Sequence, residues 1–302
     1  MSMLFLSFLM FSLSLLGLSF SNWLLFVLSM EFLLFIFIFM CFNYGLLSLS
    51  SSVIKYFILQ TIGSIFIFLG GYGVLESAMF NTSLVMLYWT GLFLKLGLFP
   101  FHFWVVPVIS YLPFYMIFLV SSVLKILPLY TLYLTFFYLY YIHFNLLLWV
   151  GMLSILFGMS LGLKAMTLRS MMGASSISQT GWFAVAVTVG HLLFYFSVYF
   201  YNLVLLMVSL LYKQYLMSSF LLLSLGGLPP FSLFFAKLMV LTEVWVSGIG
   251  LILMVGMLVS SVFSLFYYMK YSQLLFMNKS VNKFKMSFMF LFLGNLAGVL
   301  SI

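Results

Sequence analysis

Four ionisable side chains lie inside stretches of sequence that are otherwise apolar enough to cross a membrane. Glu31, Lys95 and Lys125 each have about one helical turn or more of apolar residues on both sides. Lys237 lies in a fourth apolar stretch. An ionisable group at membrane depth costs at least about 2.5 kcal/mol, so its presence there indicates a function. A low-dielectric surrounding disfavours the ammonium form of lysine, whereas a nearby carboxylate favours it. Several such lysines in series predict a proton relay.

Two structural interpretations compete with the relay. A lysine near a helix end can extend to the lipid headgroups, which suits Lys55 and Lys213 and would also explain Lys237 if its helix ended there. A structural ion pair between Glu31 and one lysine would leave two lysines unexplained. The sequence shows no hydride carrier, nucleophile triad or phosphate-binding loop. Transport is therefore the chemistry that these residues favour.

Two of the lysines lie beside an expected interruption of their helix. A proline inside a span removes a backbone hydrogen bond, and the freed carbonyls need protein or water as partners. Lysine precedes the break in LKLGLFPFHFW and follows it in SLGGLPPFSLFFAKL. The break residues are Gly97, Pro100, Gly226, Gly227, Pro229 and Pro230. Glycine and proline are common in membrane helices, which explains isolated cases but poorly explains two breaks with a lysine nearby. Pro128, three residues after Lys125, predicts a milder kink.

The composition predicts an all-α, polytopic membrane protein. Only 5% of the 302 residues are charged and 66% are hydrophobic, whereas a soluble domain has about a quarter of its residues charged. The apolar stretches repeatedly reach the roughly 20 residues that cross a bilayer. Eleven spans are expected, near residues 3–20, 22–42, 53–75, 82–104, 112–139, 144–163, 170–189, 192–211, 217–243, 248–269 and 285–302.

The short connections predict a single integral membrane domain, residues 1–302. The two interrupted spans are the fourth and the ninth, so they cross in opposite directions. This spacing predicts inverted five-helix repeats, about 1–139 and 144–269, followed by a C-terminal helix at about 285–302, with a transport site near the midplane.

The loop charges are asymmetric under this eleven-span arrangement. The side that carries the N-terminus holds eight basic residues: Lys55, Lys164, Arg169, Lys213, Lys270, Lys279, Lys283 and Lys285. The other side holds Glu76 and Glu243 and no lysine or arginine. The positive-inside rule therefore predicts an N-terminus on the cytoplasmic or matrix side. The net charge of +8 does not predict nucleic-acid binding, because the sequence has no dense basic stripe.

Cysteine and histidine do not form the patterns of a metal site. Cys41 is the only cysteine, which excludes an intrachain disulfide, a four-cysteine iron–sulfur site and a cysteine-rich zinc site. The three histidines, His102, His143 and His191, are 41 and 48 residues apart, so no two can form a clamp on one helix. No metal site is expected.

The same residues carry a resemblance to a known family. The pieces LSMEFLLF, IKYFILQ, FLKLGLFPFHFWVVP, VLKILP, LRSMMGASSISQTGW and SLGGLPPFSLFFAK follow one another between about Leu28 and Lys237. In this order they resemble the antiporter-like membrane subunits of respiratory complex I, the NADH:ubiquinone oxidoreductase, and among them the subunit 2 family. The chain departs from that family at Val108, where an acidic residue is frequent, but no departure removes a core ionisable residue.

The resemblance implies an antiporter-like fold with two discontinuous helices and a proton path through Glu31, Lys95, Lys125 and Lys237. Two roles stay open for His102, an accessory relay or a packing residue. The resemblance also implies that this chain binds no cofactor. NADH, FMN, iron–sulfur clusters and ubiquinone would bind other subunits of the complex.

For partners and location, the resemblance implies other membrane-arm subunits, further antiporter-like subunits among them, and membrane lipids. It implies a mitochondrial inner-membrane location, with the N-terminus in the matrix and the C-terminus in the intermembrane space. Two alternatives stay open: a cation/proton antiporter component without a redox partner, and a structural scaffold whose lysines contact lipid or partners.

Overall fold

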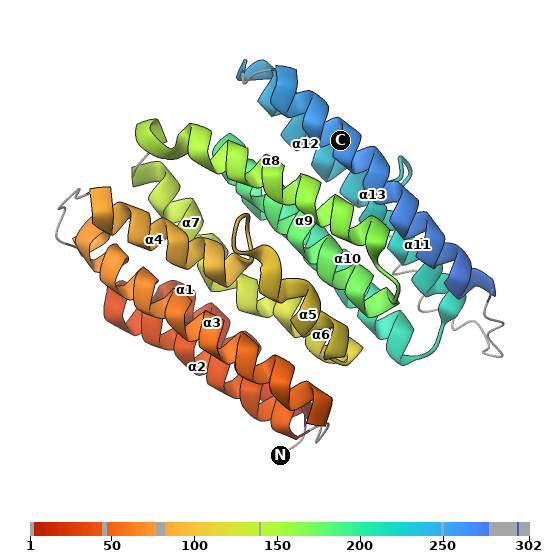
Figure 1. Cartoon of the computed structure of the whole chain (residues 1–302), viewed down its shortest axis with the longest axis horizontal. Helices are drawn as coiled ribbons and strands as arrows, with labels where there is room; N and C mark the ends of the chain where they lie inside the picture. Colours follow the sequence, from red (N-terminus) through yellow and green to blue (C-terminus); the bar gives the residue numbers. More distant parts are fainter. Residues whose placement is uncertain are drawn as a thin grey trace. The chain divides into compact units, whose positions relative to one another are not determined.

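A computed structural model describes residues 3–43, 47–76, 82–138, 140–248, 251–277 and 295. Every regular element in these residues is helical, which confirms the expected all-α class (Figure 1). The longer helices are α1 (Met3–Ser19), α2 (Trp23–Phe42), α3 (Leu47–Gly71), α4 (Thr82–Leu96), α7 (Val123–Tyr138), α8 (Tyr140–Lys164), α9 (Leu168–Val189), α10 (Leu192–Leu211), α11 (Tyr215–Gly226), α12 (Ser232–Val246) and α13 (Leu251–Met277). The shorter elements are η1 (Tyr72–Glu76), η2 (His102–Trp104), α5 (Val105–Tyr111) and α6 (Phe114–Ser121).

Ten of the eleven expected spans coincide with these helices. The eleventh, 285–302, lies outside the described residues apart from Asn295, as do Lys279, Lys283 and Lys285. Four of the basic residues expected in loops lie on helices instead: Lys55 on α3, Lys164 at the end of α8, Arg169 at the start of α9 and Lys270 on α13. Each of these helices extends beyond its expected boundary at the end that carries the basic residue.

The chain forms two compact units, Met1–Tyr140 and Tyr141–Ile302. In the first unit, α1 packs against α2, α2 packs against α3, and α3 packs along α4. In the second, α11 packs against α10 and α13, and α9 contacts α10, α12 and α13. Each unit contains one of the two expected helix breaks.

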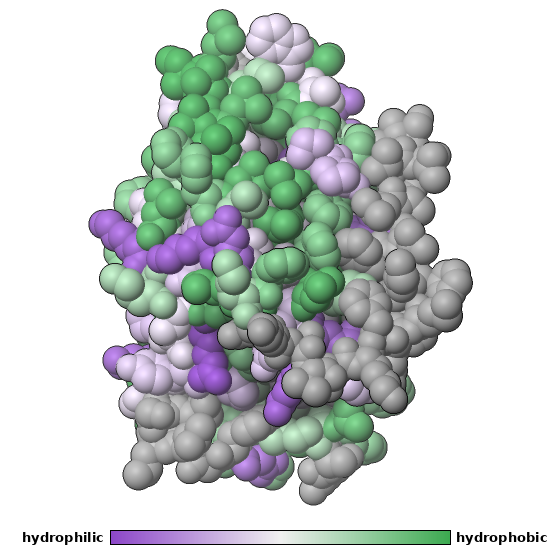
Figure 2. Space-filling view, turned by 90° about the vertical axis from the view of Figure 1, so that its right-hand side faces the viewer, coloured by the Kyte–Doolittle hydropathy of each residue, from purple (hydrophilic) through white to green (hydrophobic). Residues whose placement is uncertain are grey.

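The surface of the chain has the apolar character of a membrane protein. Six described helical stretches are long enough to cross a bilayer, with mean hydropathies from 1.8 to 2.7. Large apolar side chains face outward, and Leu193 and Ile252 are 75% and 74% exposed. On the face shown in Figure 2, hydrophilic side chains gather in a few patches on a mostly apolar surface.

Helix α9 is buried along almost its whole length, so most of its polar side chains lie inside the second unit. Nearly all its residues are buried, Ser175, Ser178 and Gln179 among them. Its ends are defined by sequence: Thr167 forms a capping box with Ser170, and Gly190 ends the helix in the left-handed region at φ +83°. This helix brings polar groups into an apolar core.

The expected spans at 82–104 and 217–243 are both interrupted. Helix α4 ends at Leu96 and the chain becomes helical again at His102, while α11 ends at Gly226 and α12 begins at Ser232. A third interruption was not expected: α6 and α7 are separated at Ser122, whose φ and ψ are −123° and −76°. Pro128 lies inside α7 and does not end it. The interruption near Lys125 is therefore upstream of the lysine.

Candidate functional site

The break after α4 follows from the backbone hydrogen bonds that Pro100 removes. The Leu96 carbonyl would pair with the N–H of residue 100, which proline lacks. The Leu98 N–H bonds the Phe93 carbonyl (3.0 Å) instead of continuing the helix, and Gly97 adopts φ +69°. Such a backbone conformation favours glycine.

Side chains from other parts of the first unit pair with the freed carbonyls. Trp104 Nε1 donates to the Leu94 carbonyl (3.1 Å), and Gln60 Nε2 of α3 donates to the Lys95 carbonyl (3.3 Å). Buried backbone groups require such partners where water is absent. Side chains of α3 and η2 therefore stabilise the interruption by donating hydrogen bonds to its free carbonyls.

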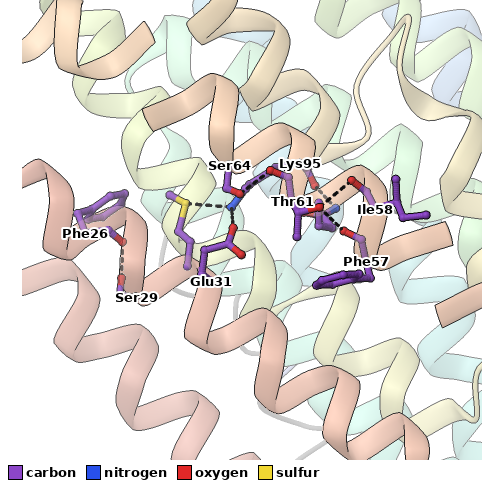
Figure 3. Close-up of polar contacts among 10 residues, drawn as sticks. Phe26, Ser29, Glu31, Phe57, Ile58, Thr61, Ser64 and Lys95 are labelled. Atoms are coloured by element: carbon purple, nitrogen blue, oxygen red, sulfur yellow. Dashed lines mark hydrogen bonds and ion pairs between the residues drawn. The ribbon is translucent and has the colours of Figure 1, made fainter. Parts of the chain in front are cut away.

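Lys95 lies at the end of α4 and is buried, and its head group faces α2 (Figure 3). Its Nζ is 3.9 Å from Glu31 Oε1 and 3.6 Å from Met30 Sδ. A separation of 3.9 Å is an ion pair but is too long for a hydrogen bond. Close helix packing holds the lysine here, because a Cβ on Gly63 would lie 3.0 Å from Lys95 Cγ.

Glu31 lies between this buried pair and an open groove. The groove has a volume of about 530 Å³ and runs between α2 and α3; its lining is mostly apolar and includes Glu31, Thr61 and Ser64. The Glu31 side chain is 21% exposed, against 4% for Lys95. The carboxylate is thus the member of the pair that can respond to a charge or to water outside the unit.

Lys125 is also buried in the first unit, at 5% exposure. It lies in the first turn of α7, where its backbone N–H bonds the Ser122 carbonyl (3.1 Å). The hydroxyl of Ser122 donates to the Phe118 carbonyl (2.6 Å). A serine hydroxyl bound in this way competes with the backbone N–H groups for helical carbonyls. Lys125 therefore shares one feature with the other two lysines: each lies within a few residues of a helix interruption.

In the second unit, Lys237 bonds directly to its helix break. Gly226 would pair with the N–H of residue 230, but Pro230 has none, and Lys237 Nζ donates to the Gly226 carbonyl instead (3.0 Å). Gly227 adopts φ +85° beside it. The Nζ also lies 5.6 Å from the centre of the Trp182 ring, within the range of a cation–π interaction.

His102 lies in η2 with its ring buried between aromatic neighbours. The ring stacks on Phe103 with centroids 4.6 Å apart and on Phe99 at 6.0 Å. These contacts place it in the turn after the break. They give it a packing role, and its accessory relay role stays a prediction.

Several residues of the site were not singled out from the sequence. Gln60, Trp104 and Trp182 contact a lysine or its neighbouring carbonyls, and Asn202 and Asn295 belong to a buried polar cluster in the second unit. The signal available for Gln60 and Asn202 is an amide in an otherwise apolar helix, where it needs a partner. Trp104 and Trp182 carry no such signal, because tryptophan is compatible with plain packing.

These features define a class: a polytopic helical membrane protein with buried lysines beside interrupted helices. A family model described as "NADH:quinone oxidoreductase/Mrp antiporter, TM" matches residues 21–264. NADH-ubiquinone oxidoreductase chain 2 of Albinaria caerulea is 32% identical over 273 residues, which cover 90% of this chain and 89% of the relative. The chain therefore belongs to the family of antiporter-like subunits of respiratory complex I.

Two solved structures share the fold at lower sequence identity. A chain of respiratory complex I from Thermus thermophilus superimposes with a TM-score of 0.76 at 21% identity, covering 94% of this chain and 74% of that one. A chain of an archaeal membrane-bound sulfane sulfur reductase gives a TM-score of 0.80 at 20% identity, covering 97% and 72%. The antiporter-like fold is thus common to membrane complexes with different redox reactions.

Proposed function

We propose that this chain is a membrane-arm subunit of the proton-translocating NADH:ubiquinone oxidoreductase and carries protons through Glu31, Lys95, Lys125 and Lys237. One observation carries the proposal: each unit contains a buried lysine beside a helix that proline interrupts. Family membership supports it, because relatives that are about a third identical are named NADH-ubiquinone oxidoreductase chain 2.

The geometry supports different roles for the residues of the path. Glu31 pairs with Lys95 and borders an open groove, so it adjusts the charge on the lysine. Lys95 and Lys125, both in the first unit, take up protons from the matrix side, and Lys237 exchanges them with the opposite side. His102 assists as an accessory relay. The breaks expose backbone carbonyls that bind water or a lysine at membrane depth.

The remaining chemistry belongs to other parts of the complex. This chain binds no cofactor, while NADH, FMN, iron–sulfur clusters and ubiquinone bind other subunits. Its partners are further membrane-arm subunits, antiporter-like ones among them, and membrane lipids. It lies in the mitochondrial inner membrane with its N-terminus in the matrix and its C-terminus in the intermembrane space. Its two halves, about 1–139 and 144–269, form inverted repeats, and 285–302 forms a terminal helix.

A second candidate function is that of a monovalent cation/proton antiporter component without a redox partner. The description of the matching family names both NADH:quinone oxidoreductase and Mrp antiporter, and this favours the antiporter as the second candidate. Fractionation of membranes separates the two functions. Migration of the chain with NADH dehydrogenase activity in a very large assembly supports the redox complex, whereas migration without that activity supports the antiporter.

The substitution Lys95→Met tests the proton path. Methionine keeps the length of the side chain and removes the charge, so the assembled complex should lose most of its coupled turnover and proton pumping. Lys55→Met is the matched control, because Lys55 is an exposed lysine on the neighbouring helix α3. Full pumping in an assembled Lys95→Met complex would contradict the proposal.

A further inference from the structure

A cluster of four polar side chains is buried at the break between α11 and α12. It consists of Asn202, Ser224, Ser232 and Asn295 and is called the Asn202 cluster below. Three of them are completely buried, and Ser232 is 8% exposed. The proton path proposed above uses none of these residues. Their position in the fold therefore needs a separate explanation.

Asn202 of α10 bonds both sides of the break. Its Oδ1 accepts a hydrogen bond from Ser224 Oγ near the end of α11 (3.0 Å). Its Nδ2 donates to Ser232 Oγ at the start of α12 (3.2 Å) and to the Val198 carbonyl of its own helix (2.9 Å). A single amide thus connects the two half-helices across the residues that cannot form helical hydrogen bonds.

Asn295 completes the cluster from the C-terminal part of the chain. Its Nδ2 donates to Asn202 Oδ1 (2.6 Å), and its Oδ1 accepts from Ser232 Oγ. Both amide oxygens therefore have donors and both amide nitrogens have acceptors. Such a satisfied buried network fixes one arrangement of the groups that it joins, since each lost bond leaves a polar group without a partner at membrane depth.

The geometry that the cluster fixes includes the hydrogen bond of Lys237. Its acceptor, the Gly226 carbonyl, is two residues after Ser224, and Lys237 itself is five residues after Ser232. Asn202 sets the separation of these two serines. It therefore sets the separation of the carbonyl and the ammonium, which belong to different half-helices.

We propose that Asn202 is a positioning residue for Lys237: by joining Ser224 to Ser232 it holds the Gly226 carbonyl within hydrogen-bond distance of the Lys237 head group. The inference rests on the proposed function of Lys237 in proton transfer. Asn202 itself does not carry the proton, and its contribution is the geometry of the break.

The substitution Asn202→Leu in the assembled complex tests the inference. Leucine has a similar volume but no hydrogen-bonding group, so the half-helices lose their connection and Lys237 loses its fixed acceptor. We expect proton-coupled turnover to fall about tenfold, the effect of one hydrogen bond to a charged group. The alkaline limb of the pH profile of turnover should move to lower pH by about one unit, because the ammonium loses its acceptor. A change that only loosened the fold would let water reach the ammonium and stabilise its charge, so it would not move this limb to lower pH.

Ser224→Ala and Ser209→Ala form a milder matched pair. Both serines are completely buried, and each hydroxyl donates to a carbonyl of its own helix, Leu206 for Ser209 (2.8 Å) and Leu221 for Ser224 (2.7 Å). Only the Ser224 hydroxyl also donates to Asn202. Ser224→Ala should shift the pH profile in the same direction as Asn202→Leu, and Ser209→Ala should leave it unchanged. This pair carries the test if Asn202→Leu does not assemble.

The Lys237→Met background separates the inference from the proposed function. If Asn202 acts through Lys237, Asn202→Leu adds no further loss of pumping to Lys237→Met. An unchanged pH profile in both Asn202→Leu and Ser224→Ala, beside impaired pumping in Lys237→Met, overturns the inference alone. Normal pumping in assembled Lys237→Met overturns the role of Lys237 and the inference with it.

Discussion

The contact between Lys237 and the helix break can be perturbed by a substitution at Gly227, which leaves the lysine residue itself unchanged. In the substitution Gly227→Ala, the new residue must adopt φ +85°, which costs about 1 kcal/mol for a residue with a Cβ. The added Cβ would also lie 3.2 Å from Lys237 Nζ and 3.3 Å from its Cδ. These distances are tight, so the lysine side chain must move by a few tenths of an ångström. The substitution therefore has two effects: strain in the backbone at residue 227 and displacement of the Lys237 side chain.

The hydrogen bond between Lys237 Nζ and the Gly226 carbonyl, now 3.0 Å, is the interaction most affected by this movement. Complete loss of a hydrogen bond to a charged group is worth about 1.5 to 3 kcal/mol, which corresponds to roughly a 10- to 100-fold change in rate. We expect partial loss, and hence a fall in coupled turnover of about tenfold or less. The thermal midpoint of the complex should fall because of the backbone strain and because part of this hydrogen bond is lost.

Gly190→Ala is the matched control for the backbone strain of alanine at a positive φ. Gly190 ends α9 at φ +83°, and a Cβ there meets nothing within 4 Å. Both variants should therefore share the loss of stability that comes from backbone strain, measured as the thermal midpoint of the purified complex, and any larger fall in Gly227→Ala comes from the Lys237 contact. Only Gly227→Ala should lower the number of protons pumped per electron in proteoliposomes. Equal pumping by the two variants would refute the reasoning that this contact of Lys237 is functional.

Two further predictions concern the first unit. Gln60→Leu removes the donor to the Lys95 carbonyl and should destabilise the complex by about 1 to 3 kcal/mol, measured by thermal unfolding; an unchanged midpoint would show that this carbonyl finds another partner. Glu31→Gln keeps the shape of the carboxylate and removes a Coulomb attraction of about 4 kcal/mol at 3.9 Å and an effective dielectric constant of about 20. It should slow coupled turnover less than Lys95→Met does, and wild-type turnover would remove Glu31 from the path.

Thr61→Val is a control for Gln60→Leu. The Thr61 hydroxyl bonds the Phe57 and Ile58 carbonyls of its own helix, at 3.1 and 3.0 Å, so its loss leaves no carbonyl outside α3 without a donor. We expect a thermal midpoint close to that of the unchanged complex. A similar fall in both variants would assign the effect to α3 in general and not to the Lys95 carbonyl.

The helix breaks could be predicted from sequence because their cause is covalent. Pro100 and Pro230 lack an N–H whatever surrounds them, and Gly97 and Gly227 tolerate positive φ. Pro128, for which the sequence predicted only a milder kink, lies within the first two turns of α7 and does not end that helix. The interruption occurs at Ser122, where serine hydroxyls compete for helical carbonyls.

The hydrogen-bond partners across helices could not be predicted in the same way. That Gln60 and Asn202 need partners follows from their chemistry, but the identity of the partners depends on how α3 and α10 are rotated and shifted against their neighbours. Gln60 bonds a backbone carbonyl 35 residues away, and Asn202 bonds Asn295, 93 residues away. No local pattern encodes contacts at such separations. They follow from the packing of whole helices.

The two breaks satisfy their carbonyls in different ways, and this difference bears on the two lysines. In the first unit Gln60 and Trp104 pair with the freed carbonyls, so the Lys95 head group is available to Glu31. In the second unit Lys237 itself pairs with the Gly226 carbonyl and faces the Trp182 ring, both of which are neutral.

A lysine paired with a carboxylate responds strongly when that carboxylate changes its charge, because the Coulomb interaction at membrane depth is weakly screened. A lysine held by a neutral carbonyl depends instead on the geometry of the break. Charge changes outside the first unit would therefore act on Lys95 through Glu31. At Lys237 the corresponding control is the separation of the half-helices, which the buried amide of Asn202 holds.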